Sequence, residues 1–297
     1  MQTKRKRRLG ALLLLLAAFL LSLTPLAAET VSTAPVSVKN TDVSRYEKIP
    51  IYAVEGERLA VDGRLVESTT YLPLRAFLDA YMPWAEITYD ARSRTATVNT
   101  ASLTLSATDG SHILYANGRC LYGNTPIRIL SDGRMYVPIR LLAKTLSLSV
   151  YWSEKWRSVT LSGAATPLES GDSFYDAEDL KWLSHIISAE AQGEPFIGQV
   201  AVGNVVLNRR AHSEYPDTVK AVIFDKQGGV YQFSPVKDGS IWNTPYYVSV
   251  TAAKVCLEGT TVSEGILFFY APSMVYSTWI ERNRPYAFTI AGHKFFY

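Results

Sequence analysis

The sequence has few cysteines and few histidines. Its 297 residues include two cysteines, Cys120 and Cys256, one in each half, and four histidines. A dense disulfide framework is therefore excluded as the source of stability, and only a single bridge across the halves could form. The histidines follow no H-x-x-x-H or similar spacing, so no zinc-ligand pattern is present, although scattered ligands stay compatible with the sequence.

Excess charge of one sign is also scarce in this chain. The formal net charge is +3, and the first 28 residues contain five basic and no acidic residues. Without that segment the net charge is −2, which argues against a general nucleic-acid binder. By contrast, 47% of the residues are hydrophobic and 12% are aromatic. This composition is typical of a folded protein, and the length suits about two domains.

The N-terminal residues 1–28 have the pattern of a secretory signal peptide. The basic residues 4–8 precede an apolar run from Ala11 to Leu23, and Pro25-Leu26-Ala27-Ala28 offers small residues for cleavage. An uncleaved membrane anchor is the alternative, since residues 9–28 are nearly continuously apolar. Both interpretations place the rest of the chain outside the cytoplasm.

Two stretches of linker composition divide the remaining chain. Residues 29–50 are rich in Thr, Ser, Val and Pro, and "SGAATPLESGDS" at 162–173 has the same character. We therefore predict a linker at 29–50, a middle domain at 51–163, a second linker at 164–174 and a C-terminal domain at 175–297.

The middle domain contains an internal repeat. "YLPLRAF" (71–77) and "EITYDARSRTATV" (86–98) are echoed by "YVPIRLL" (136–142) and "SVYWSEKWRSVTL" (149–161), at a spacing of 65 residues from Tyr71 to Tyr136. Each copy predicts a short helix with proline at its start and then a β-hairpin with a charged turn. The fold class predicted here is a β-rich α+β repeat domain.

These repeats resemble the stalk-type copper amine oxidase N-terminal-like domain of exported bacterial proteins. The resemblance implies a spacer, or a module that contacts the cell wall or an accessory protein. It does not imply copper, because His112 is the only histidine of the domain and has no partner at ligand spacing. We expect no metal and no cofactor.

The C-terminal domain predicts a mainly helical α+β fold with a small sheet. A helix opens at Asp176 and ends near Gln192, and Pro195 begins a second helix. A short helix follows Pro216, then a long polar and aromatic loop at 227–247 and a helix at about 246–258. The segments 266–272 and 293–297 have strand character.

Glu190 occupies an unusual position on the first of these helices. Leu180, Leu183, Ile187 and Glu190 follow steps of three and four, so the carboxylate shares the inward stripe. Burying an ionised carboxylate costs several kcal/mol unless it is paired, and the usual result is a raised pKa or a committed partner. A half-buried Glu190 that caps the next helix, or pairs with Arg209 or Arg210, is the structural alternative.

Five motifs in register resemble the SleB/CwlJ-type cell wall hydrolases, which include spore-cortex-lytic enzymes. They are "AEAQGEP", "GQVAVGNVVLNRR", "FSP" at 233–235, "FFYAP", and the ending that contains Trp279, Arg284, Ile290, Gly292 and His293. The resemblance implies a lysozyme-like core that acts on peptidoglycan, with Glu190 catalytic. Gln192 and Ala271 depart from the family's commoner residues, and Ala271 puts one substrate contact in doubt.

The single strong acid favours a lytic transglycosylase. Hydrolysis of a glycosidic bond usually takes two carboxylates, whereas a transglycosylase can use one because the C6 hydroxyl of muramic acid attacks and a 1,6-anhydro product closes. A hydrolytic muramidase or glucosaminidase is the alternative, as is a wall-binding protein without turnover. Glu194 is the rival acid, but we predict that it has a structural capping role.

Other residues are weaker candidates. The aromatic and polar residues of the 227–247 loop suit sugar stacking, and we predict substrate contacts for Tyr231, Phe233, Ser234, Trp242, Tyr270 and His293. Phe233 could instead be core. Asn208 lies among apolar residues, so we expect it to bond across the fold.

Two other enzyme classes fit poorly. A cysteine peptidase would need Cys256 with His293, but Cys256 lies on an apolar helical stripe and is expected to be a small buried residue. A zinc amidase would need a ligand pattern that His185, His212 and His293 do not form.

Overall fold

The computed structural model describes residues 42–53, 56–274 and 279–297. The predicted signal peptide lies outside these residues, as does most of the predicted linker at 29–50. All described residues belong to one compact unit. Within them, no helix has the length and apolar character needed to cross a membrane.

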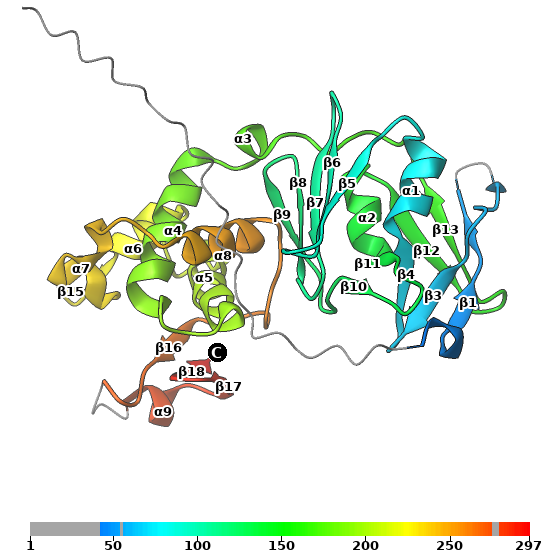
Figure 1. Cartoon of the computed structure of the whole chain (residues 1–297). Helices are drawn as coiled ribbons and strands as arrows, with labels where there is room; N and C mark the ends of the chain where they lie inside the picture. Colours follow the sequence, from blue (N-terminus) through cyan, green and yellow to red (C-terminus); the bar gives the residue numbers. More distant parts are fainter. Residues whose placement is uncertain (1–41, 54–55, 275–278) are drawn as a thin grey trace, which may run out of the picture. The chain divides into compact units, whose positions relative to one another are not determined.

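In its described residues, the stalk domain has three sheets, two short α-helices and the 3-10 helix η1 (Figure 1). Its elements are η1 Val43–Arg45, β1 Glu47–Ile49, β2 Ile51–Tyr52, β3 Gly63–Val66, β4 Thr69–Pro73, α1 Leu74–Tyr81, β5 Ile87–Asp90, β6 Thr95–Asn99, β7 Thr104–Thr108, β8 Ile113–Ala116, β9 Arg119–Tyr122, β10 Arg128–Ile129, β11 Met135–Pro138, α2 Ile139–Thr145, β12 Ser149–Ser153 and β13 Ser158–Ser162. The strand orders are β1-β3-β4-β11-β10, β5-β6-β7-β8-β9 and β12-β13-β2. Because β1 pairs with β3, residues 47–49 belong to this domain, and the predicted linker boundary at 50 is wrong.

The internal repeat is confirmed. Each copy is a strand, a helix and a hairpin: β4-α1-β5-β6 in the first and β11-α2-β12-β13 in the second. The strands β4 and β11 pair antiparallel with each other, so Tyr71 lies opposite Pro138 and Pro73 opposite Tyr136. Proline precedes each helix, since its missing N–H is not needed there.

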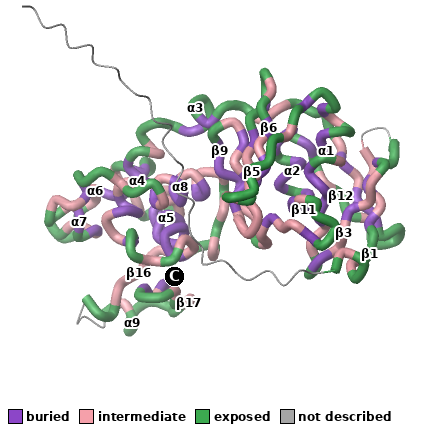
Figure 2. Tube along the Cα trace, in the orientation of Figure 1, coloured by how far each residue is buried: buried purple, intermediate pink, exposed green. Residues whose placement is uncertain are grey.

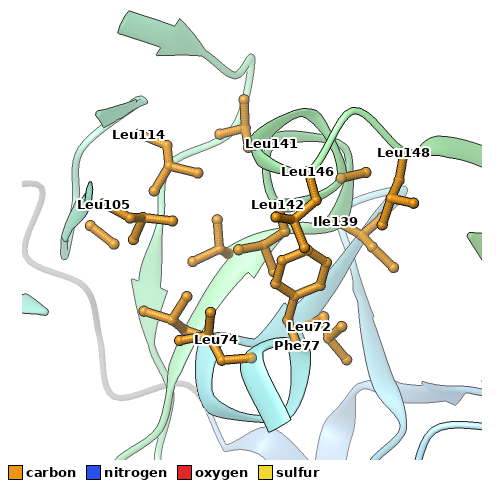
Figure 3. Close-up of a cluster of buried hydrophobic side chains, with 14 of the residues drawn as sticks. Leu72, Leu74, Phe77, Leu105, Leu114, Ile139, Leu141, Leu142, Leu146 and Leu148 are labelled. Carbon is orange, nitrogen blue, oxygen red and sulfur yellow. The ribbon is translucent and has the colours of Figure 1, made fainter. Parts of the chain in front are cut away.

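The core of this domain comes from both copies and from the intervening strands. Figure 3 shows Phe77 of α1, Leu142 of α2 and Leu105 of β7 in one buried cluster. The helix of each copy buries its apolar face against this shared core. One copy alone would therefore leave the apolar face of its helix exposed.

The C-terminal domain is mainly helical, as predicted. Its elements are α3 Gly171–Phe174, α4 Ala177–Ala191, α5 Phe196–Ala211, α6 Val219–Phe224, β14 Lys226–Gln227, β15 Val230–Tyr231, α7 Ser234–Asp238, η3 Ser240–Trp242, α8 Tyr247–Leu257, β16 Phe268–Tyr270, α9 Trp279–Asn283, β17 Tyr286–Ile290 and β18 His293–Phe296. The strands form one sheet, β16-β18-β17, and a two-stranded ribbon, β14-β15. The 227–247 segment is therefore not plain loop, because it holds β15, α7 and η3.

Helices α4, α5 and α8 pack against one another, and Figure 2 shows α5 and α8 as largely buried. Gly203 of α5 allows the close approach, since a Cβ there would lie 2.6 Å from Cys256 Sγ and 2.8 Å from Ile187 Cδ1. Cys256 is buried and free, as is Cys120, so no disulfide joins the halves. This three-helix core holds α4, the helix that carries Glu190.

Candidate active site

Glu190 lies in the last turn of α4, on the stripe that the sequence predicts. Leu183 and Ile187 of that stripe are fully buried, and Glu190 is half-buried. Asp176 caps the start of α4 by accepting a hydrogen bond from the Asp179 backbone N–H at 2.8 Å, and the helix ends at Ala191 before Gly193. The carboxylate therefore sits at a helix C-terminus, where the helix dipole disfavours negative charge.

The side chain of Glu190 has no hydrogen-bond or ion-pair partner among the described residues. The expected alternatives do not form, because Arg210 pairs with Asp179 at 2.7 Å and Arg209 Nε donates to the Leu267 carbonyl at 2.7 Å. Burial, followed by the negative charge of Asp238, raises the pKa of Glu190 to about 7, and the positive charge of Arg209 opposes the rise. A carboxyl group that titrates near neutrality can both give and accept a proton.

Two residues act on Glu190 electrostatically, Asp238 and Arg209, and sequence reasoning missed the first of them. Asp238 ends α7, and its Oδ1 accepts hydrogen bonds from the backbone N–H and the hydroxyl of Ser240, which lower its pKa and keep it ionised. Arg209 is buried between the rings of Tyr215, Phe233 and Phe268. Asp238 lacked any signal beyond a polar loop context, whereas Arg209 was a candidate partner of Glu190 and acts only through its charge.

Glu194 has a structural role, but not the predicted capping role. Pro195 caps α5 without any side-chain hydrogen bond. The carboxylate of Glu194 instead accepts a hydrogen bond from the Gly292 N–H at 3.2 Å and lies 3.3 Å from His293 Nδ1. It therefore ties the start of α5 to the turn between β17 and β18.

Two predicted substrate residues are buried. Phe233 is 2% exposed and packs against Phe269 and Arg209, so its predicted sugar contact is wrong and the core alternative holds. His293 is 7% exposed and lies edge-on to Phe269. Its imidazole is used in packing beside Glu194, which leaves little surface for a sugar.

The other candidates remain accessible. Trp242 is 64% exposed and rests edge-on against Trp182 of α4. Ser234 is exposed at the start of α7, and Tyr231 of β15 is half-buried under Lys226. Tyr270 donates a hydrogen bond to Glu281, which also pairs with Lys294 at 2.7 Å. Thus Glu281 is an ion-pair residue.

Helix α4 also fixes the segment that carries Trp242. His185 Nδ1–H donates to the Ile241 carbonyl at 2.8 Å, and the Ser188 hydroxyl accepts from the Tyr246 N–H at 3.1 Å. Asn208 of α5 donates to the Ile266 carbonyl at 3.0 Å, which confirms the predicted bond across the fold.

Cysteine and metal chemistry find no support in the side chains. Burial raises the pKa of the Cys256 thiol, and its sulfur faces the Val200 carbonyl at 3.4 Å. Among the described residues, no group of three or more His, Cys, Asp or Glu side chains could hold a metal ion. His112 donates from Nδ1 to the Gly123 carbonyl and stacks on Tyr122, so the donor set of the stalk does not fit a copper centre.

Comparison with known proteins identifies both domains. The cell wall hydrolase family model matches residues 193–297, starting three residues after Glu190, and the copper amine oxidase N-terminal domain model matches residues 53–161. The chain is similar to the spore cortex-lytic enzymes of Oceanobacillus iheyensis (35% identity over 130 residues, 44% of this chain, 45% of the relative) and Bacillus subtilis (33% over 121 residues, 41% of this chain, 38% of the relative). It therefore spans less than half the length of these relatives.

Two solved structures are also similar. One is the catalytic domain of the germination-specific lytic transglycosylase SleB from Bacillus anthracis, with 32% identity, a TM-score of 0.38, and coverage of 44% of this chain and 100% of that domain. The other is the catalytic domain of Bacillus cereus SleB, with 32% identity, a TM-score of 0.37, and coverage of 41% and 92%.

Proposed function

Because the C-terminal region of this chain belongs to the SleB-type cell wall hydrolases, we propose that the protein cleaves peptidoglycan glycan strands as a lytic transglycosylase. The proposed bond joins N-acetylmuramic acid to N-acetylglucosamine, and the proposed setting is the spore cortex during germination. The observation that carries the proposal is the environment of Glu190, a half-buried carboxyl group without a partner in the described structure and with a pKa of about 7.

The chemistry needs one group that first gives and then takes a proton. Protonated Glu190 donates to the O4 atom of the departing N-acetylglucosamine while its bond to C1 of muramic acid breaks. The C6 hydroxyl oxygen of the same muramic acid then bonds to C1, and its proton passes to the Glu190 carboxylate. No water is consumed, and Glu190 ends the cycle protonated.

Asp238 supports the hydrolytic alternative. It is a second carboxylate within electrostatic reach of Glu190, and a hydrolase could use such a group to activate water. However, Oδ1 of Asp238 is held by two hydrogen bonds from Ser240, which suit a fixed negative charge better than a base. We therefore keep the transglycosylase as the main proposal.

The decisive experiment is mass spectrometry of digested peptidoglycan. Anhydro-muropeptides support the transglycosylase, new reducing ends indicate a hydrolase, and free stem peptides would contradict both.

We predict that Glu190→Gln loses at least about 10³-fold of the cleavage rate while binding to insoluble wall persists, because the amide cannot donate the proton.

Glu178→Gln is the matched control for this variant. It makes the same chemical change on the same helix, at an exposed residue that pairs with Lys220. It should cleave like the parent protein. Full activity of Glu190→Gln would refute the catalytic assignment, whereas a parent protein that binds the wall without cleaving it would favour a wall-binding protein.

A further inference from the structure

The stalk domain holds two cavities at equivalent positions of its two repeat copies. The first has a volume of about 610 Å³ and the second about 780 Å³, both in the range of small-ligand sites. Equivalent residues line them: Pro73, Leu74, Arg75, Asp79, Tyr89 and Arg94 in the first, and Pro138, Ile139, Arg140, Lys144, Trp152 and Arg157 in the second. The cavity shape is thus a property of the repeat, and only the differences between copies can point to a ligand.

Each cavity is lined by three cations and one acid, so the two copies differ in where the acid lies: on the helix in the first and on the hairpin, at Glu154, in the second. At the equivalent helix position the first cavity has Asp79 and the second has Lys144. In the first copy Arg75 donates to the Ala85 carbonyl at 3.4 Å and lies on the same helix face as Asp79. In the second, neither Arg140 nor Lys144 has a hydrogen-bond or ion-pair partner within the described residues.

The hairpin arginines do not change this contrast. Arg94 pairs with Asp109, and Arg134 of the first cavity pairs with Asp132 at 3.9 Å. In the second copy Arg157 pairs with Glu47 at 2.6 Å and with the lining acid Glu154 at 3.5 Å. Within the described residues, only the second cavity therefore carries two cations without an ion-pair partner, Arg140 and Lys144. They lie at i and i+4 on α2, an arrangement that slightly destabilises an isolated helix and suits an anionic ligand.

The remaining lining favours a peptide over a phosphate polymer. Leu65, Val150 and Trp152 give apolar walls, and Asn124 and Thr125 add polar groups. A stem peptide of peptidoglycan offers both methyl and methylene groups and free carboxylates, whereas a polyol phosphate has little apolar surface. We propose that the second stalk cavity binds the carboxylate-bearing peptide stem of peptidoglycan, a choice of polymer that rests on the proposed function.

The cavity also lies next to the catalytic domain. Tyr122, one of its lining residues, stacks on Phe196 with ring centroids 6.1 Å apart, and Phe196 begins α5 directly after Glu194-Pro195. A stem bound there is held beside the domain that carries Glu190. The stalk is then a wall-binding module as well as a spacer.

The test is binding of a free stem tetrapeptide to the full-length protein, measured by calorimetry at low salt. The probe has no sugar, so the glycan-cleaving site does not contribute. Lys144→Asp, which copies the residue of the first cavity, should weaken binding at least about tenfold, and Arg140→Gln about fivefold. Amidation of the peptide carboxylates should weaken binding to a similar degree.

Lys155→Asp is the matched control, since it makes the same charge change at an exposed turn residue outside the cavity. Its affinity should equal that of the parent. The proposal is overturned if Lys144→Asp and Arg140→Gln bind as the parent does, or if only poly(glycerol phosphate) binds. Cleavage of soluble glycan strands is measured in parallel: a parent protein that binds the peptide but cleaves nothing would refute the proposed function alone.

Discussion

Glu190 and Glu178 lie on the same helix, yet their environments move their pKa values in opposite directions. Hydrogen bonds from Lys220 and Trp182 lower the pKa of exposed Glu178, whereas burial and the charge of Asp238 raise that of Glu190. The residue type is identical, so the difference in chemistry comes from the surroundings. A carboxyl group near neutrality in a partly dry environment is typical of a functional site.

The role of Asp238 can be tested through the pH profile. Its negative charge disfavours ionisation of Glu190, so Asp238→Asn should lower the pKa of Glu190. Because Glu190 must be protonated to act as acid, the alkaline limb of kcat/KM should move to lower pH. Asp217→Asn, at an exposed residue, is the control and should leave the limb in place. If Asp238→Asn instead loses activity at every pH and the alkaline limb of kcat/KM does not move, Asp238 is a catalytic base.

Glu190 should also cost stability at high pH. Its folded-state pKa of about 7 lies above the unfolded value of 4.5, so the protonated form favours folding and this advantage disappears as pH rises through 7. Glu190→Gln should match the parent near pH 4 and exceed it by about 1–3 kcal/mol near pH 8 in urea unfolding. A difference that is independent of pH would contradict the raised pKa.

At the scale of elements, α4 is a scaffold for both the acid and an exposed aromatic residue. Its last turn carries Glu190, while His185 bonds to the backbone of Ile241 in η3 and Ser188 to the backbone of Tyr246, which follows η3. Trp242 is thereby held against the same helix that carries the acid. Its exposure and its edge contact with Trp182 suit a sugar-stacking platform.

Trp242→Ala should therefore weaken glycan binding more than the chemical step. We expect KM for soluble glycan strands to rise about five- to tenfold with a small change in kcat, because the stacking surface is lost while Glu190 stays in place. Trp84→Ala removes an equally exposed tryptophan from the stalk domain and is the control. An unchanged KM for Trp242→Ala would remove this residue from the substrate site.

The sequence predicted the elements that have strong local signals. The inward position of Glu190 followed from helical spacing, and the stalk repeat from its proline and hairpin motifs. The sequence left both a core and a substrate role open for Phe233, and it did not predict the contacts of Glu194, because both depend on β16 and β18, which lie far away in the sequence. The same holds for Asp238, since its effect on Glu190 depends on how α7 packs against α4.

At the scale of the whole molecule, a buried ion pair joins the two domains. Arg119 of β9 donates two hydrogen bonds of 2.7 Å to the carboxylate of Glu258, which follows α8, and the side chains are only 10% and 3% exposed. Tyr175 donates to the same carboxylate at 2.8 Å. Ile113 and Cys120 of the stalk domain also belong to the core cluster of the helical domain. This interface fixes the stalk cavity relative to α5.

Breaking the pair should separate the unfolding of the two domains. Glu258→Gln leaves Arg119 buried without a counter-charge, which typically costs about 3–5 kcal/mol. The parent protein, with its shared core, should unfold in one calorimetric transition, whereas the variant should show two, with the first at lower temperature. Glu264→Gln makes the same change at an exposed residue of the helical domain and should leave a single transition in place. A Glu258→Gln variant that unfolds in one transition at the parent temperature would mean that the apolar contacts alone hold the domains together.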